Sequence, residues 1–315
     1  MTAFYSSKFF RVPLVVGAAV LAACLLALVG LENPAQAAFP GANGKIAFVS
    51  DRDGDNDIYT VGPTGDNLKR LTNNSKNDAS PAWSPDGRKI VYSSGLTGTA
   101  YSADIFVMNA DGSGKTLITD ERSISGTLKG DDAYPVFSPD GRRIVFVRKD
   151  LNNPEGDLYK ISTDGKNLTR LTRLSYDQPC CPAWSPDGSK IAYSVWDGYD
   201  NSVETVKPDG SGRSFFHYGG SPDWSPDGSQ LVFDSYGVIN KIDADGTDEK
   251  QLTTGEAYGS NPAFSPDDSK IVFQSAARDG NFIYDLYVMD ADGTDVRQLT
   301  DDPAQEFFPD WRPVR

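Results

Sequence analysis

The sequence predicts an all-β fold, a six-bladed β-propeller with four antiparallel strands in each blade, and three observations lead to it. A Pro-x-Trp/Phe-Ser-Pro-Asp motif recurs six times, with a truncated last copy. Each full copy is followed by the same order of strand-like runs and tight turns, and the copies lie 40 to 54 residues apart. This spacing suits four-stranded propeller blades and is too long for leucine-rich or ankyrin repeats.

The copy that begins at Ser80 shows how one blade is built. Asp-Gly turns and one variable loop separate its strand-like runs, and in these turns glycine supplies a positive φ. The four runs are Pro81 to Ser84, Lys89 to Ser93, Asp104 to Asn109 and Lys115 to Thr119. Alternating apolar, β-branched and aromatic residues in these runs are typical of strands.

An aromatic residue stands at one equivalent position in every copy. We expect it to pack between neighbouring blades, because each such ring can bury about 150–250 Å², which stabilises the fold by several kcal/mol at about 25 cal/mol per Å². The six residues are Trp83, Phe137, Trp184, Trp224, Phe264 and Trp311.

The two ends of the repeat region complete each other. Residues from Phe39 to Phe48 match the turn and second strand of a blade but lack a first strand, and Phe307 to Trp311 supply a first strand with no second. We therefore expect one blade to be built from both termini, which closes the ring and removes its open edge.

The repeat resembles the WD-like repeat of TolB-type six-bladed propellers, on the pattern P-x-W/F-S-P-D-G followed by D-I/L-Y/F, a second D-G and a closing Leu-Thr. The resemblance covers residues 38–315, which are expected to form a single propeller domain. It implies an exported scaffold that binds a protein or peptide. TolB proteins also carry an α/β domain before the propeller, and we expect it to be absent here, because the apparent leader runs straight into the first blade.

Residues 1–37 read as an export signal. Lys8 and Arg11 precede an apolar run from Val12 to Leu31, and Ala35-Gln36-Ala37 fits a signal-peptidase site, so cleavage is expected after Ala37. An uncleaved membrane anchor and acylation at Cys24 are the two alternatives. The chain is thus predicted to be periplasmic or extracellular, and envelope-anchored under either alternative.

Composition restricts the class of partner. The chain has 315 residues, 38% of them hydrophobic, and a formal net charge of −14. Such a charge argues against nucleic acid or an anionic membrane surface as a partner and favours a basic protein or peptide. We expect a monomer that contacts a membrane only through its N-terminal segment.

Recognition is expected at the face that carries the long, unequal loops, here called the near face; the Asp-Gly turns lie on the opposite, far face. Acids at the near-face mouth of the channel are predicted to bind the partner: Asp78, Asp132, Asp177 and Glu306. In the first blade Asp51, Asp53 and Asp55 are weak candidates for Ca²⁺, since carboxylate oxygens suit that ion. Solvated or structural acids are the competing interpretation, and no cofactor is otherwise predicted.

An enzyme is not predicted. The only histidine, His217, stands among aromatic residues, and no G-x-S-x-G nucleophile elbow or sialidase-type Asp-box occurs. The alternative is a Ca²⁺-dependent hydrolase or a carbohydrate-binding propeller that uses carboxylates at the channel mouth. The adjacent Cys180 and Cys181 are either two small packed side chains or a strained vicinal disulfide.

Overall fold

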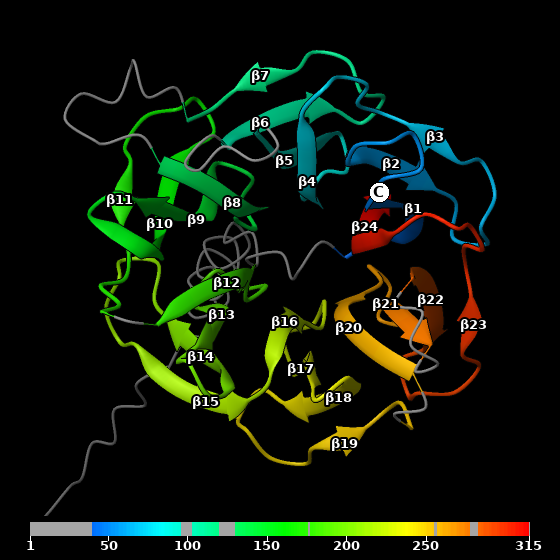
Figure 1. Ribbon diagram of the computed structural model, residues 1–315. Coiled ribbons are helices and arrows are strands. Elements are labelled where there is room, and N and C mark those ends of the chain that lie inside the picture. The colour runs from blue at the N-terminus through cyan, green and yellow to red at the C-terminus, as the bar shows by residue number, and fades with distance from the viewer. Residues whose placement is uncertain are drawn as a thin grey trace, which may run out of the picture. The chain divides into compact units, whose positions relative to one another are not determined.

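The structure is a computed structural model that describes residues 40–95, 103–119, 130–175, 177–254, 257–277 and 283–314. These residues form six four-stranded antiparallel sheets arranged as blades around a central axis (Figure 1). The predicted fold class is thereby confirmed. The predicted leader, with Val12 to Leu31 and Cys24, lies outside the described residues. Within the described part, no helix has the length and apolarity that a membrane span requires.

The innermost strand of each blade faces the axis and the outermost is the shortest or most exposed. Blade 1 contains β24 (Glu306–Val314), β1 (Ala42–Ser50), β2 (Asp57–Val61) and β3 (Lys69–Arg70). Blade 2 contains β4 (Asn77–Trp83), β5 (Lys89–Gly95), β6 (Asp104–Asn109) and β7 (Thr116–Leu117). Blade 3 contains β8 (Gly130–Phe137), β9 (Arg143–Asp150), β10 (Asn153–Ser162) and β11 (Thr169–Arg170).

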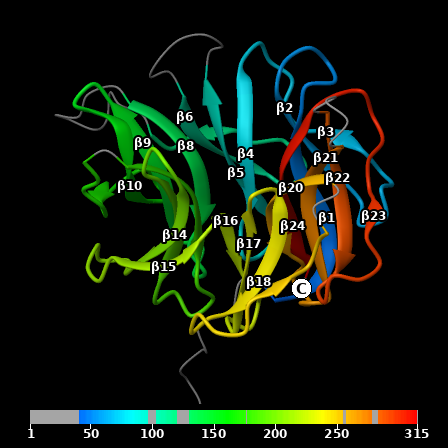
Figure 2. The same cartoon turned by 60° about the horizontal axis from the view of Figure 1, so that its bottom comes forward.

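The second half of the ring repeats this order, and Figure 2 shows strands of both halves running between the two faces. Blade 4 contains β12 (Gln178–Trp184), β13 (Ile191–Trp196), β14 (Asn201–Val206) and β15 (Ser214–Tyr218). Blade 5 contains β16 (Gly220–Trp224), β17 (Gln230–Ser235), β18 (Val238–Asp243) and β19 (Lys250–Gln251). Blade 6 contains β20 (Ala257–Phe264), β21 (Lys270–Ala277), β22 (Tyr284–Asp290) and β23 (Arg297–Gln298).

Blade 1 closes the ring as the sequence predicts. Strand β24 pairs antiparallel with β1, with Trp311 opposite Ile46 and Glu306 opposite Ser50. The C-terminal strand also contacts blade 2, where the Arg312 guanidinium lies over the Trp83 ring and its Nε donates to the Gly87 carbonyl at 2.8 Å. Both ends of the chain thus contribute strands to one sheet.

The hydrophobic core is divided among the six interfaces between neighbouring blades. At the interface of blades 1 and 2, for example, Val49 and Ile58 pack with Trp83 and Tyr92. All six motif aromatics are buried, with exposed fractions from 0% at Trp83 to 7% at Trp184. The prediction that they pack between blades is confirmed. The role of the six motif aromatics is therefore structural.

Every innermost strand contains a β-bulge at the residue before the motif proline. That residue has a left-handed backbone, with φ between 49° and 54° in all six blades. The register shifts at the same point in each inner strand, for instance between Cys180 and Ala183. The bulge residues are Ser80, Tyr134, Cys181, Ser221, Asn261 and Phe308. None is β-branched, as a left-handed conformation requires.

The first far-face turn of each full copy also needs a left-handed residue. Glycine fills this position in four blades, as at Gly188 with φ 69°, but blade 6 has Asp268 with φ 63°. Aspartate tolerates this conformation better than most residues. The departure from the motif at Asp268 therefore leaves the turn unchanged.

Candidate functional site

The predicted acid Asp132 forms a buried ion pair inside blade 3. Its two oxygens accept hydrogen bonds from Arg148 Nε at 2.6 Å and Nη2 at 2.7 Å, and both side chains are almost fully buried. The two residues lie opposite each other on β8 and β9. A bidentate pair with this geometry satisfies the charge that burial would otherwise leave uncompensated.

The acids Glu306 and Asp78 occupy related positions near the near-face ends of β24 and β4. Glu306 pairs with Arg52 and accepts a hydrogen bond from Thr300. Asp78 accepts a hydrogen bond from Asn74 Nδ2 at 2.7 Å. Burial raises the pKa of Glu306 to about 7 and also raises the pKa of Asp78. Both carboxyls therefore face this chain's own side chains.

The structure corrects one part of the predicted acidic rim. Asp78, Asp132 and Glu306 are each at most 1% exposed, because internal donors hold their carboxyls. Only Asp177 has a partly exposed side chain, which lies 3.1 Å from Arg213 Nη2. The four acids do not form one open surface, and partner binding by them stays a prediction.

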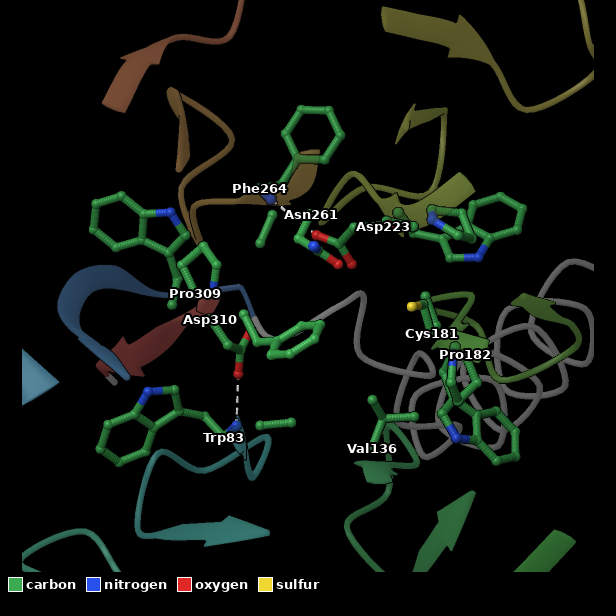
Figure 3. A pocket seen from close by; sticks show the side chains of 18 of the residues that line it. Trp83, Val136, Cys181, Pro182, Asp223, Asn261, Phe264, Pro309 and Asp310 are labelled. Carbon is green, nitrogen blue, oxygen red and sulfur yellow. Dashed lines mark hydrogen bonds between the residues drawn. The ribbon is translucent and has the colours of Figure 1, made fainter. Parts of the chain in front are cut away.

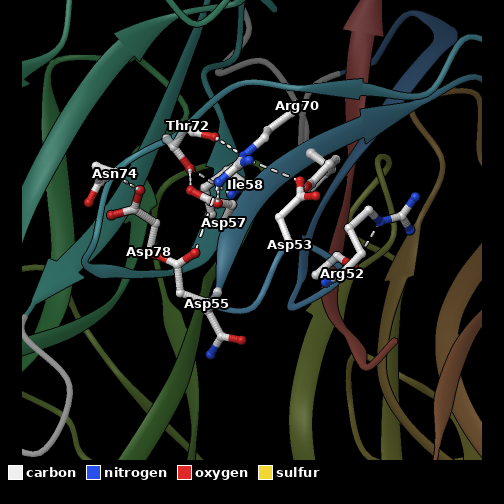
Figure 4. A network of polar contacts seen from close by, with 12 residues as sticks. Arg52, Asp53, Asp55, Asp57, Ile58, Arg70, Thr72, Asn74 and Asp78 are labelled. Carbon is white, nitrogen blue, oxygen red and sulfur yellow. Dashed lines mark hydrogen bonds and ion pairs between the residues drawn. The ribbon is translucent and has the colours of Figure 1, made fainter. Parts of the chain in front are cut away.

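Two of the three weak Ca²⁺ candidates, Asp53 and Asp55, lie beside Arg70 (Figure 4). Asp53 is 3.0 Å from Arg70 Nη1 and Asp55 is 3.9 Å from Nη2. Asp51 instead accepts a hydrogen bond from the Gln305 N–H at 2.8 Å. Within the described ranges, no group of three or more His, Cys, Asp or Glu residues is placed to hold a metal ion. Ca²⁺ binding stays a prediction.

An acid that recurs in the third strand of the blades has a structural role. Thr72 Oγ1 donates to Asp57 at 2.8 Å and accepts from the Ile58 N–H at 2.8 Å, which ties the closing Leu-Thr of the blade to its third strand. Asp157 and Thr172 repeat this contact in blade 3 at 2.7 Å. The acid is therefore part of the blade itself.

A cavity of about 170 Å³ lies on the axis between the innermost strands (Figure 3). Its wall comes from the bulge residue and the next three residues of the motif, together with far-face prolines such as Pro139 and Pro226. Tyr134 of blade 3 and Phe308 of blade 1 contact each other edge to face, with ring centroids 5.8 Å apart. This contact narrows the channel at the level of the bulges, on the near-face side of the prolines.

Two carboxylates interrupt the largely apolar wall of this cavity. Asp223 and Asp310 occupy the variable motif position, where the other blades have Ala82, Val136, Ala183 and Ala263. Asp310 Oδ2 accepts a hydrogen bond from the Trp83 N–H at 2.6 Å, and Asp223 Oδ2 accepts one from the Phe264 N–H at 2.8 Å. Each bond joins neighbouring blades.

The pKa values of both carboxyls are raised in the cavity. Burial raises the pKa of Asp223 to about 7, and burial together with the nearby Asp223 raises the pKa of Asp310 to about 7. Among the described residues, no Lys or Arg side chain forms an ion pair with either. The pair therefore offers negative charge to a cationic group that enters the cavity.

Sequence reasoning missed Asp223 and Asp310 because the motif position was treated as variable. The signal was present: in an innermost strand, a residue beside the buried aromatic lines the axis, and a charged residue there departs from the alanine or valine of other blades. His217, by contrast, lies on the outermost strand β15. Its ring packs against Phe233 with centroids 5.1 Å apart, and it does not line the cavity.

Comparison with known proteins agrees with this architecture. The family model described as "TolB beta propeller domain" matches residues 32–119 and 174–314. The Tol-Pal system protein TolB of Helicobacter hepaticus is 27% identical over 219 residues, 67% of this chain and 49% of that protein. Dipeptidyl-peptidase 5 of Porphyromonas gingivalis is 34% identical over 121 residues, 36% of this chain and 17% of that protein.

Among solved structures, TolB from Acinetobacter baumannii superposes with a TM-score of 0.70 at 22% identity, over 97% of this chain and 75% of that chain. At this identity the likeness shows the shared fold. The chain spans less than half the length of the curated relatives named above. The family match covers more than half of the chain, and the chain belongs to the TolB β-propeller domain family.

Proposed function

We propose that this chain is an exported, non-catalytic scaffold that binds a protein or peptide partner by taking one basic side chain of the partner into the axial cavity. The observation that carries the proposal is the pair Asp223 and Asp310, two cavity carboxylates without a cationic partner among the described residues. The basic character of the partner agrees with the net charge of −14.

The size of the cavity favours a side chain over a larger ligand. A cavity of about 150 Å³ holds a molecule the size of benzene, whereas typical small-molecule pockets measure about 300–1,000 Å³. The cavity here, about 170 Å³, suits one lysine or arginine side chain. The apolar wall would pack against the methylene groups and the carboxylates would meet the charged end.

The direction of entry follows from the cavity wall. The Tyr134 and Phe308 rings meet on the near-face side, whereas far-face prolines line the other end. We therefore place the docking surface at the far face, opposite the face that the loops suggest. The names of relatives support the class of function, since Tol-Pal system proteins are among them.

The alternative, a Ca²⁺-dependent hydrolase or carbohydrate-binding propeller, has no specific observation in its favour in the described part of the chain, where no metal-binding cluster is found. A peptidase name among the relatives belongs to a protein of which this chain covers 17%.

Selection from a displayed library of random peptides tests the proposal. The immobilised protein should enrich peptides with Lys or Arg, and enrichment should disappear in the double variant Asp223→Asn with Asp310→Asn. Asp177→Asn is the matched control, since it removes one acid of the predicted near-face rim and leaves the cavity intact. Equal enrichment in the double variant and the parent contradicts the cavity as the binding site, and loss only in Asp177→Asn would move the site to the near face.

A further inference from the structure

Cys180 and Cys181 bring two thiols together on the inner strand of blade 4. Their Sγ atoms are 2.9 Å apart, and both side chains are partly buried as free cysteines. Successive side chains of a regular strand point to opposite faces, which would separate two adjacent thiols. A local feature of the backbone must therefore turn one of them.

The bulge of the inner strand is that feature. Cys181 is the bulge residue of blade 4, with φ 54°, and the register of β12 against β13 shifts between Cys180 and Ala183. The same bulge occurs in the other five blades with different residue pairs, such as Ala79 and Ser80 in blade 2. The backbone arrangement thus belongs to the fold, and the thiol pair belongs to this blade.

The surroundings make the two thiols unequal. The pKa of Cys180 is lowered, first by the hydrogen bond from Cys181 and then by the Ser194 hydroxyl, against the opposing effect of burial. The same contact and burial raise the pKa of Cys181, with Asp234 adding to the effect. Cys180 is therefore the thiol that ionises first, and the thiolate is the reactive form of cysteine.

The pair lies beside the axial cavity and is not fully buried. Cys181 lines the cavity (Figure 3). Tyr134 and Ser221 belong to the same wall. Ser194 Oγ, which contributes to the shift at Cys180, also accepts a hydrogen bond from the Ser221 N–H at 2.6 Å. Hydroxyl groups of two blades thus surround the thiols, and both cysteine side chains remain partly exposed.

We propose that Cys180 and Cys181 are a reversible dithiol–disulfide pair beside the axial cavity, which a disulfide of the glutathione class oxidises at the partly exposed Cys180. The Cys180 thiolate attacks one sulfur of the reagent, forms a mixed disulfide and releases one glutathione thiolate. The Cys181 thiol loses its proton and attacks Cys180 Sγ, which closes the vicinal disulfide and expels the second glutathione. Two electrons pass from the cysteines to the reagent, and two protons pass to the released thiolates.

The resulting bond is expected to be easily reduced. Adjacent Cα atoms lie about 3.8 Å apart across a trans peptide, which is less than the 4.4–6.8 Å of ordinary disulfides. A strained disulfide has a more oxidising potential and is the labile kind. The pair can therefore be oxidised or reduced as the redox potential of its surroundings changes, unlike a structural disulfide. This proposal does not depend on the partner proposed above.

Peptide mass mapping of the full-length protein tests the proposal. Trypsin should release residues 174–190 as one peptide that contains both cysteines and excludes Cys24. After incubation with oxidised glutathione, this peptide should lose the mass of two hydrogens and regain it with dithiothreitol. In Cys181→Ser, the same peptide should instead carry one glutathione, because no second thiol resolves the mixed disulfide.

Serine at position 181 should leave the fold intact, since Ser80 and Ser221 occupy the same bulge in other blades; circular dichroism checks this. The comparison with protein unfolded in urea isolates the effect of the bulge on the rate at which the vicinal disulfide forms. This rate should be several-fold higher in the folded protein than in the unfolded protein. Free thiols or a persistent glutathione adduct in the folded parent, or closure no faster than in urea, would overturn the proposal.

Discussion

Asp310 and Trp83 lie far apart in the sequence, yet the Asp310 carboxylate accepts a hydrogen bond of 2.6 Å from the Trp83 N–H across the boundary between blades 1 and 2. Asp223 and Phe264 form the same bond between blades 5 and 6. The four blades with alanine or valine at this position lack a carboxylate to make it. These bonds fix one oxygen of each acid and hold both carboxyls at the cavity wall.

The raised pKa values of Asp223 and Asp310 predict a dependence of stability on pH. In the unfolded chain an aspartate has a pKa near 3.9, and in the folded protein both have values of about 7. Between these values the folded state binds more protons, so the free energy of unfolding should fall as pH rises from about 4 to about 7. Urea denaturation at a series of pH values measures the slope.

Asparagine at both positions removes the titration and keeps an oxygen for the Trp83 and Phe264 N–H groups. The double variant should be more stable than the parent at pH 8 by on the order of 2 kcal/mol, after allowance for solvent screening in the channel. The slope between pH 4 and pH 7 should become shallower, with the part due to Glu306 remaining. An unchanged slope contradicts the assignment.

Breaking the buried pair of Asp132 and Arg148 should be costly. Asp132→Asn leaves the Arg148 charge buried without its carboxylate, which is expected to lower the free energy of unfolding by about 3 kcal/mol. Asp177→Asn is the matched control, because its pair with Arg213 is partly exposed and should matter by less than about 1 kcal/mol. Equal effects of the two substitutions contradict the internal role of Asp132.

Loss of the C-terminal strand should open the ring. Deletion of residues 307–315 removes most of β24, including the buried Trp311, and leaves β1 as an unpaired edge. We expect a large fall in melting temperature and a tendency to associate through that edge. Deletion of residues 314–315 alone is the control and should change the melting temperature little. Closure by β24 is refuted if the longer deletion melts like the full chain.

Asp268 should be a mildly destabilising residue. Its φ of 63° is left-handed, and burial raises its pKa, so glycine should fit better. We expect Asp268→Gly to stabilise the protein by about 1 kcal/mol. The reverse change, Gly188→Asp, should destabilise it by a similar amount, since only a proline atom 4.0 Å away lies near the added Cβ. Effects of the opposite sign in either urea titration contradict this view of the turn.

The repeat made the fold predictable, because turn residues and buried aromatics obey local rules. The third strand of blade 2 was predicted with the bounds that the structure shows, Asp104 to Asn109, and the pairing of β24 with β1 was predicted as well. These features depend on spacing and on residues close in sequence.

The ion-pair partners of the acids were less predictable, because these partners lie elsewhere in the sequence and come close only in the folded structure. Nothing in the sequence near Asp132 indicates that Arg148 faces it from the next strand, or that Arg52 reaches Glu306 from the other end of the chain. The left-handed bulge that joins Cys180 to Cys181 was also missed, since serine, tyrosine and phenylalanine at this position give no signal for a positive φ.

The backbone conformation of the bulge before each motif proline does not depend on which side chain stands there. This conformation is the same in six blades, while the residue ranges from small to aromatic. The belt of side chains around the axis can therefore diverge one blade at a time in size, polarity and reactivity without a change in the strands. In this fold, selectivity can evolve through six independently variable positions whose shared restriction is the avoidance of β-branched residues.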